Sequence, residues 1–368
     1  MYKIIQMAFA FIGVIVGAGF ASGNEILQYF TSFGAWGTAG AVLSTGLFAY
    51  LGMMLMQMGS RLQTQSHDEA IYKLSGKFMG VAVDYIIIFT LFGVGVVMVA
   101  GAGSMLNQQY GAPNWVGSLI MTVLVVSTVL LPIQRVIALI AAITPFLILA
   151  LAIICTYSLF TSHASLEELE PIATSVQSSL PNWFISAINY VSFNVAVGAG
   201  MSLVMGGSEK NENIAKWGGL LGGLGVGVLI MIAHFAIFLN IKDVKDMSLP
   251  LLKIIQDISP VLGIMMTVVL FGMIYNTGVA MYYAFVARFT VMQTKRSYLF
   301  AIGTGLVGFV ASFVGFTGLV AYFYPLIGYL GLLLIAILIA APFRIKKGSK
   351  VEQHNTNDDA EVLGVPTV

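Results

Sequence analysis

The stretch Val14–Ile26, VIVGAGFASGNEI, is apolar at both ends and is interrupted by glycines, a serine, an asparagine and a glutamate. Its surroundings are apolar enough to span a membrane, yet glycine disfavours a helix and a carboxylate is costly in lipid. The stretch therefore predicts a break and a polar group in the middle of a membrane-spanning helix.

The composition indicates a membrane protein. Of 368 residues, 58% are hydrophobic and 9% are charged, whereas a soluble protein carries roughly 25% charged residues. Apolar runs of about 20 residues recur along the chain, which is typical of a polytopic α-helical protein in a lipid bilayer. The net charge of +1 does not indicate nucleic-acid binding, and the single Cys155 leaves no internal disulfide or cysteine cluster for a metal. The first apolar run lacks a convincing cleavage site and is treated as the first span.

The hydropathy pattern predicts ten spans. Their approximate limits are 4–32, 35–59, 79–105, 114–132, 135–160, 183–206, 217–240, 260–287, 297–315 and 319–342. If the N-terminus is cytoplasmic, the external Lys and Arg residues are Lys242, Lys245 and Lys253, out of 17 in the chain. This bias predicts a multi-pass protein of the bacterial cell membrane with both termini in the cytoplasm.

The motif VGAG occurs midway along the first predicted span, at Val16–Gly19, and midway along the sixth, at Val197–Gly200. Each half of the spanning region thus has five spans and begins with a glycine-rich one, so the second half runs through the membrane in the opposite direction. This arrangement is typical of inverted-repeat transporters with discontinuous helices. The predicted units are a first repeat, an external loop, a second repeat and a disordered cytoplasmic tail, at residues 1–160, 161–182, 183–342 and 343–368.

The residues after the first break resemble a helix start. Ser22 and Glu25 have the spacing of a capping box, so a half-helix is expected to begin there. We expect residues 17–22 and 198–201 to be non-helical, close together and next to a cavity, because unwound backbone within a membrane lines protein or water. The alternative is that these glycines only let helices pack closely.

The chain resembles YkvI-like bacterial membrane proteins of the amino acid–polyamine–cation superfamily, which share the LeuT fold, over residues 1 to about 342. VGAGFASGNEI (Val16–Ile26) is similar to the broken first helix of sodium-coupled amino acid symporters. SFNVAVGAG (Ser192–Gly200) resembles their sixth helix, and YNTGVA (Tyr275–Ala280) the part of the eighth that supplies sodium ligands. The resemblance implies an all-α membrane protein with ten transmembrane helices, a 5+5 inverted repeat, discontinuous helices 1 and 6, and alternating access.

The resemblance also implies a sodium site. Gly17 and Phe20 would offer backbone carbonyls, and Asn276 and Thr277 would offer side-chain oxygens, a ligand set that suits a hard cation. The Asn276 amide has a competing use in helix–helix bonding. In some relatives a second sodium lies beside the substrate, but the seventh span offers His234 instead of an asparagine, so no second sodium is expected.

The expected substrate is a small amino acid or related amine, since no Arg or Lys lies mid-membrane to pair with a carboxylate. The residues expected around it are Gly19, Ala21, Ser22, Gly23, Asn24, Phe89, Asn194, Gly198 and Gly200. Residues 246–258 resemble a short amphipathic helix and are expected to form an external lid. No cofactor is expected beyond sodium as the coupling ion.

Several alternatives stay open at this point. Glu25 is interpreted as a helix cap, a contact for a substrate amine or a proton carrier. Asp84 is a candidate proton relay, and His234 is expected to be a packed or hydrogen-bonded histidine. A proton-coupled transporter and a non-transporting membrane sensor are the competing functions. The chain lacks a nucleophile–base set, metal-binding His and Glu spacing and a phosphate loop, so an enzyme is not expected.

Overall fold

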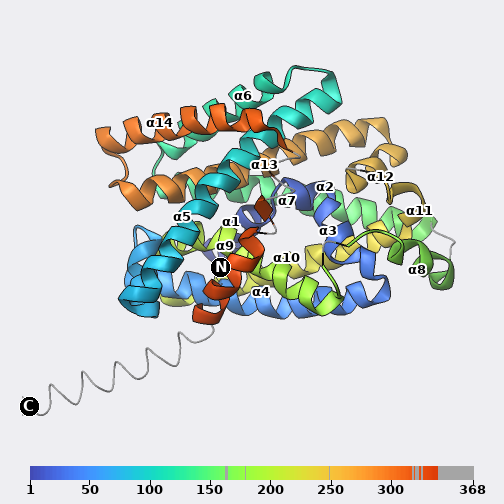
Figure 1. The fold of residues 1–368 in the computed structure, drawn as a ribbon, viewed down its shortest axis with the longest axis horizontal. Coiled ribbons are helices and arrows are strands. Elements are labelled where there is room, and N and C mark those ends of the chain that lie inside the picture. The colour runs from blue at the N-terminus through green and yellow to red at the C-terminus, as the bar shows by residue number, and fades with distance from the viewer. Residues whose placement is uncertain are drawn as a thin grey trace, which may run out of the picture.

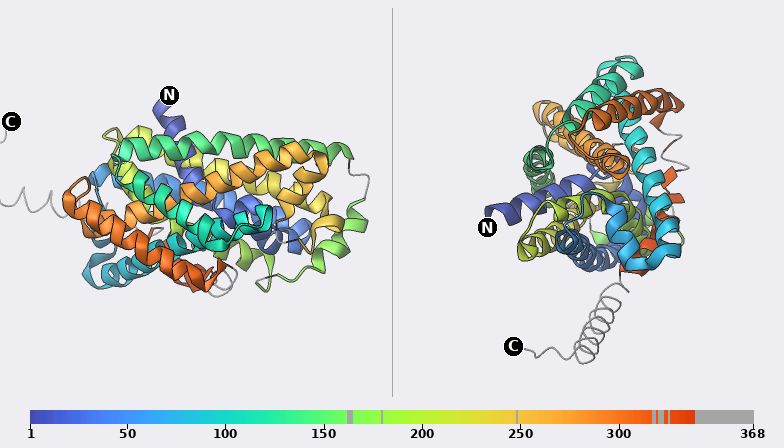
Figure 2. Two further views of the ribbon diagram at one scale, coloured as in Figure 1. Left: turned by 90° about the horizontal axis from the view of Figure 1, so that it is seen from above. Right: turned by 90° about the vertical axis from the view of Figure 1, so that its left-hand side faces the viewer.

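The computed structural model describes residues 1–161, 165–178, 180–247, 249–316, 319, 323–324 and 326–338, and these residues form a bundle of helices (Figure 1). The bundle is drawn from two further directions in Figure 2, where the N-terminal end of the first helix extends beyond its neighbours. The predicted tail at 343–368 and parts of the last predicted span lie outside the described residues.

The N-terminal segment consists of α1 (Tyr2–Ile15), α2 (Ala18–Ser22), α3 (Asn24–Tyr29) and the 3-10 turn η1 (Thr31–Phe33). The long helices after it are α4 (Ala35–Leu62), α5 (His67–Tyr110), α6 (Asn114–Val129), α7 (Ile133–Thr161), α9 (Trp183–Gly207), α10 (Glu212–Leu239), α13 (Pro260–Phe289) and α14 (Lys295–Ala311). The short elements are α8 (Leu166–Thr174), α11 (Ile241–Val244), α12 (Pro250–Ile258) and the 3-10 turn η2 (Ser312–Val314).

Each predicted span contains an apolar helix. In the described part of the chain, 7 helices are long and apolar enough to cross a membrane. Three shorter apolar helices, Tyr2–Ile15, Asn114–Val129 and Leu326–Leu338, lie in the remaining predicted spans. That these three also complete a crossing, which would give ten spans, stays a prediction.

Two groups of helices enclose α1. The helices α4, α9 and α10 pack on one side, while α5, α6, α13 and α14 pack on the other, and α1 contacts α7, α9, α10 and α13 (Figure 1). Small residues permit a close crossing of α4 and α10, because a Cβ atom built at Gly52 of α4 would lie 2.8 Å from the carbonyl oxygen of Gly219 of α10. Glycine contacts of this kind are typical of helix interfaces in membranes.

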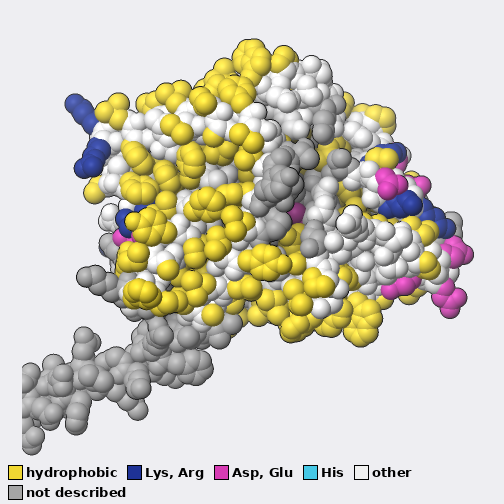
Figure 3. Space-filling model, in the orientation of Figure 1, with side chains coloured by type: hydrophobic (Ala, Val, Ile, Leu, Met, Phe, Trp, Pro, Cys, Tyr) yellow, Lys and Arg dark blue, Asp and Glu magenta, His cyan; other side chains and the backbone are white. Residues whose placement is uncertain are grey.

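The surface is that of a protein surrounded by lipid. Large hydrophobic side chains are exposed along the outer faces of the bundle, among them Val268 of α13 and Leu306 of α14, at 66% and 60% exposure. Figure 3 shows hydrophobic side chains over most of one face and charged side chains gathered at its two ends. The apolar flank and the several apolar helices make the chain a multi-pass membrane protein.

The predicted break in the sixth span is wrong. Helix α9 runs without interruption from Trp183 to Gly207, and residues 198–201 are helical. The break in the first span is present, although it is shorter than the predicted 17–22, because residues 18–22 form one helical turn between two glycines. Helix 1 is therefore discontinuous, and helix 6 is not.

Candidate substrate and ion site at the break in the first helix

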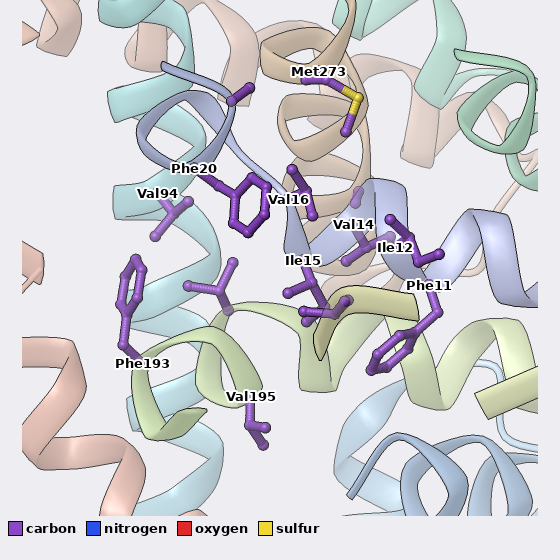
Figure 4. Packing of buried hydrophobic residues seen from close by; sticks show 14 of the residues in the cluster. Phe11, Ile12, Val14, Ile15, Val16, Phe20, Val94, Phe193, Val195 and Met273 are labelled. Carbon is purple, nitrogen blue, oxygen red and sulfur yellow. The ribbon is translucent and has the colours of Figure 1, made fainter. Parts of the chain in front are cut away.

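The break lies between α1 and α3 and has two parts. After Ile15, Val16 and Gly17 are extended, with φ and ψ of −81° and 95° at Val16 and of −92° and −164° at Gly17. The turn of α2 then ends at Gly23, whose φ of 89° is in the left-handed region that favours glycine. Figure 4 shows Val16 on the extended link and Phe20 on the following turn, packed in one buried cluster with Phe193 of α9.

The predicted capping box does not form. The N-cap of α3 is Gly23, which has no side-chain cap, and Ser22 belongs to the preceding turn. The Ser22 hydroxyl donates to the carbonyl oxygen of Gly19 at 2.9 Å and accepts the N–H of Asn24 at 3.3 Å. Ser22 thus closes the turn of α2, and the Glu25 side chain is left for another contact.

Thr277 of α13 faces the extended link. Its Oγ1 atom lies 3.4 Å from the carbonyl oxygens of both Val14 and Val16, two residues that the sequence did not single out. A Cβ atom built at Gly17 would lie 3.5 Å from the same hydroxyl oxygen. The structure therefore brings the eighth predicted span to the break, as the resemblance implied, with Val14 and Val16 presenting the nearest carbonyls.

Asn276 lies beside Thr277 and is fully buried. Its amide Nδ2 donates to the carbonyl oxygen of Ile140 of α7 at 3.0 Å, which is the helix–helix bond that the sequence left open. Its Oδ1 atom accepts no hydrogen bond from the described residues. The carbonyls of Gly17 and Phe20 accept the N–H groups of Ala21 at 3.0 Å and Gly23 at 2.8 Å. A carbonyl oxygen has two lone pairs, so each retains one for a further ligand.

The second glycine motif serves packing. A Cβ atom at Gly198 of α9 would collide with the Cδ1 atom of Ile15, the last residue of α1. One at Gly200 would lie 3.2 Å from Leu91 of α5 and 3.3 Å from Ala284 of α13. Gly198 therefore lies against the end of α1, just before the break, and the close-packing alternative, rather than unwinding, explains the glycines of α9.

Glu25 is a buried carboxylate at the start of α3, with 9% exposure. The Tyr190 hydroxyl of α9 donates to its Oε2 atom at 3.1 Å. The carboxyl folds back onto the α2 turn, where a Cβ atom at Gly19 would lie 2.6 Å from the Glu25 Cδ atom. Tyr190 was missed by sequence reasoning, although it lies one helical turn before Asn194, whose Nδ2 donates to the Tyr190 carbonyl at 2.9 Å.

Other predicted residues divide between the site and its surroundings. Ala21 is fully buried next to the break, and the Asn24 Oδ1 accepts Gln28 Nε2 at 2.6 Å. Phe89 of α5 is 47% exposed and packs against Phe323, with ring centroids 4.9 Å apart. His234 is the expected hydrogen-bonded histidine, because its two ring nitrogens contact the hydroxyls of Thr31 and Thr38 at 3.0 and 3.1 Å.

The predicted lid lies over the break. Helix α12 begins at Pro250, and a Cβ atom at Gly23 would lie 2.8 Å from the Cγ atom of Leu251. The buried face of α12 consists of Pro250, Leu251, Leu252, Ile254 and Ile255. The amphipathic segment thus covers the α2–α3 junction with its apolar side.

Asp84 of α5 is held in an ion-pair network. Arg288 of α13 donates from Nε to Oδ1 at 2.9 Å and from Nη2 to Oδ2 at 2.6 Å. His67 Nε2 lies 3.0 Å from Oδ1, and Arg288 Nη1 lies 3.5 Å from Asp68 Oδ2. This pairing favours a role in fastening the first part of α5 to the end of α13 over the proton relay.

No model of a known protein family matches the chain. The chain is 27% identical over 312 residues to the uncharacterised membrane protein YkvI of Bacillus subtilis (strain 168), which covers 84% of this chain and 88% of YkvI. It is also 27% identical over 269 residues to the uncharacterised protein YyaD of the same organism, covering 73% of this chain and 76% of YyaD.

Solved transporter structures share the fold. MhsT in complex with L-phenylalanine matches with a TM-score of 0.66 and 15% identity, over 91% of this chain and 88% of MhsT. A Na⁺-coupled sialic acid symporter in a substrate-bound outward-open state matches with a TM-score of 0.68 and 12% identity, over 92% of this chain and 78% of the symporter. Mhp1 in an inward-facing conformation matches with a TM-score of 0.56 and 12% identity, over 93% of this chain and 77% of Mhp1. The chain is therefore similar to the membrane protein YkvI over most of its length, and its fold is the LeuT fold of these solved structures, as the motif resemblance implied.

Proposed function

We propose that this protein is a secondary active transporter of the bacterial cell membrane that couples sodium to the symport of a small amino acid or related amine. The observation that carries the proposal is the pair of oxygen side chains on α13, Asn276 and Thr277, next to the broken backbone of the first helix. The Asn276 Oδ1 is buried without a partner among the described residues, and a buried acceptor left in that state is destabilising unless something binds it.

The spacing of the oxygens at Thr277 supports a shared cation. An O–H···O hydrogen bond has a typical length of about 2.7–2.8 Å, whereas the Thr277 Oγ1 lies 3.4 Å from each of two carbonyl oxygens. Oxygens that surround one ion at about 2.4 Å in octahedral geometry stand about 3.4 Å apart, and Ca²⁺, an ion of similar radius to Na⁺, is bound at such distances. The separations of Thr277 Oγ1 from the Val14 and Val16 carbonyl oxygens therefore match those between neighbouring ligands of one hard cation.

The named neighbours give the proposal its substrate range. MhsT was solved with L-phenylalanine, and the sialic acid symporter is Na⁺-coupled. The break in helix 1 and its contact with α13 are the features on which such coupling would rest in this chain. In alternating access, we expect α12 to move away from Gly23 when the site opens to the outside. The contact between Gly23 and Leu251 of α12 then corresponds to the externally closed state.

The test is sodium-dependent uptake of amino acids and amines by proteoliposomes that contain the full chain. Thr277→Val removes one oxygen at nearly constant volume, and loss of a polar partner costs about 1–3 kcal/mol. We therefore expect sodium-dependent substrate binding to weaken by roughly tenfold or more. The matched control is Thr267→Val, since Thr267 is also a buried threonine of α13 but donates to Gly263 within its own helix.

Proton coupling is the second candidate, and the buried Glu25 carboxylate favours it. If Glu25 carries the coupling ion, uptake proceeds without sodium, follows an imposed pH gradient and collapses in Glu25→Gln. That result, together with unchanged uptake in Thr277→Val, contradicts sodium coupling. With sodium coupling, sodium dependence persists in Glu25→Gln.

A further inference from the structure

The Glu25 carboxylate has too few partners for a buried anion. Among the described residues its one hydrogen bond comes from the Tyr190 hydroxyl, and no Lys, Arg or His forms an ion pair with it. An ionised carboxylate can accept about four hydrogen bonds. A buried charge without an opposite charge is strongly destabilising, so the site as folded is suited to receive a cation.

Three buried tyrosines lie in the neighbourhood of this carboxylate, and one of them, Tyr190, contacts it. Besides Tyr190 of α9, Tyr29 of α3 and Tyr324 interact electrostatically with Glu25. The rings of Tyr29 and Tyr190 are 5.1 Å apart at 54°. Each phenolic oxygen can accept a hydrogen bond while its own proton is directed elsewhere. The set therefore offers a negative charge and several neutral acceptors to a donor-rich cation.

The side chains packed against these tyrosines are aromatic. Phe30 packs edge-on against Tyr190, with ring centroids 5.1 Å apart, and Phe193 packs against Tyr324 at 4.5 Å. A metal ion has no apolar surface to bury against such side chains, whereas an organic ligand gains free energy by burying its carbon atoms there. An alkylammonium group also donates three hydrogen bonds, and it is attracted to aromatic faces. This composition favours an organic ammonium over a bare metal ion.

We propose that Glu25, with Tyr29, Tyr190 and Tyr324, forms the recognition site for the ammonium group of the transported substrate. This inference rests on the proposed function and narrows its substrate class, because a ligand needs the amine but not a carboxylate. The carboxyl lies against Gly19, so this site adjoins the break in the first helix. Primary amines are accordingly expected to bind, and sodium is expected to bind elsewhere, at α13.

The experiment measures thermal stabilisation of the purified full chain in sodium-free buffer by three phenyl compounds of similar size. Phenethylamine carries the ammonium alone, 2-phenylethanol is its neutral counterpart, and 3-phenylpropionate carries the carboxylate alone. Isoamylamine and isoamyl alcohol repeat the comparison with a smaller aliphatic body. We expect both amines to raise the melting temperature at millimolar concentrations and the alcohols and the carboxylate to have no effect.

Glu25→Gln keeps the size of the side chain and removes its charge, and we expect it to weaken amine binding at least tenfold. Thr267→Val is the matched control and is expected to leave amine binding unchanged, because Thr267 is a buried threonine of α13 that donates to Gly263 within its own helix. Equal amine binding in wild type and Glu25→Gln overturns the inference, as does stabilisation by alcohols equal to that by amines, or none by either amine. The wild-type comparison decides the matter even if Glu25→Gln fails to fold.

Uptake separates this inference from the proposed function. If Glu25→Gln takes up a substrate with sodium at wild-type affinity, the ammonium site is contradicted, whereas the proposal of a sodium symporter stands. If amines bind in a Glu25-dependent way but the protein moves no substrate into proteoliposomes, the ammonium site stands, whereas the proposal of a symporter is contradicted. Stabilisation of the wild type by sodium that is lost in Glu25→Gln and unchanged in Thr277→Val assigns the carboxylate to the metal ion and overturns the inference.

Discussion

Glu25 and Gly19 are coupled, because the carboxyl of one lies on the α-carbon of the other. A Cβ atom at Gly19 would be 2.7 Å from the Glu25 Cγ atom and 2.6 Å from its Cδ atom. No side chain larger than hydrogen fits at Gly19 without displacing the carboxyl from Tyr190. The glycine of the break therefore positions the carboxylate as well as interrupting the helix.

We predict that Gly19→Ala destabilises the protein by about 1–3 kcal/mol, the usual effect of inserting a methyl group into a packed site. The measurement is reversible unfolding in detergent, compared between the wild type and the Glu25→Ala background. Because Glu25→Ala removes the atoms that the new methyl group meets, the penalty of Gly19→Ala is expected to fall below about 0.5 kcal/mol there. The same penalty in both backgrounds would mean that Gly19 is constrained by another contact.

The sequence predicts some residue contacts well and others not at all. The placement of Thr277 against the first helix follows from the span 8 motif, but the choice of Val14 and Val16 as nearest carbonyls depends on how the backbone turns at Gly17. Likewise Ser22 has the spacing of a helix cap, yet its hydroxyl donates to the carbonyl oxygen of Gly19. Short-range spacing restricts which groups can meet, and the local backbone angles decide which do.

At the scale of helices, the same four letters VGAG produce two outcomes. After the first copy the chain continues with Phe20 and Ala21 and then with Ser22, Gly23 and Asn24, residues that favour turns over helix interiors. After the second it continues with Met201, Ser202, Leu203 and Val204, and α9 carries on through them. The second part of the break, at Gly23, therefore depends on the residues that follow the motif, and the second copy is not followed by such a run of residues, so α9 continues where a break was predicted.

The α2–α3 junction is fixed by Gly23, and we predict that Gly23→Ala destabilises the protein by about 2 kcal/mol or more. A left-handed conformation costs a residue with a Cβ atom about 1–2 kcal/mol, and this Cβ atom would also lie 2.8 Å from Leu251 Cγ and 3.1 Å from Leu251 N. The readout is thermal unfolding in detergent. Adding Leu251→Ala is expected to restore only part of the loss, since the backbone nitrogen and the positive φ remain.

The control for this change is Gly46→Ala in α4, a helical glycine whose added Cβ atom would meet nothing within 4 Å. Alanine is favoured over glycine in a helix interior by about 1 kcal/mol, so this variant is expected to be as stable as the wild type or more so. A similar loss in both variants would show that glycine substitutions are harmful here for a reason unrelated to the junction.

At the scale of the whole molecule, ion pairs lie at both ends of the bundle. The ion pair Arg61–Glu212 lies at one end of the bundle, and Lys242–Glu168 lies at the other. Glu170 of α8 accepts the N–H of Ala35 at the start of α4, whereas Arg61 is in its last turn. A helix of this length, Ala35–Leu62, extends about 40 Å, so these two ends stand on opposite sides of a bilayer.

We predict that the end with Arg61 is cytoplasmic and the end with Glu168 is external, which is the orientation that the Lys and Arg distribution favours. Single cysteines in place of Glu168 and Arg61, in a Cys155→Ser background, test it with a membrane-impermeant maleimide. These side chains are 61% and 47% exposed in their ion pairs, so access to the reagent, rather than burial, governs their labelling. Glu168→Cys is expected to react on intact cells and Arg61→Cys only after permeabilisation. The reverse pattern would place both termini outside and leave the LeuT fold unchanged, since the fold rests on the arrangement of the helices and not on their orientation in the membrane.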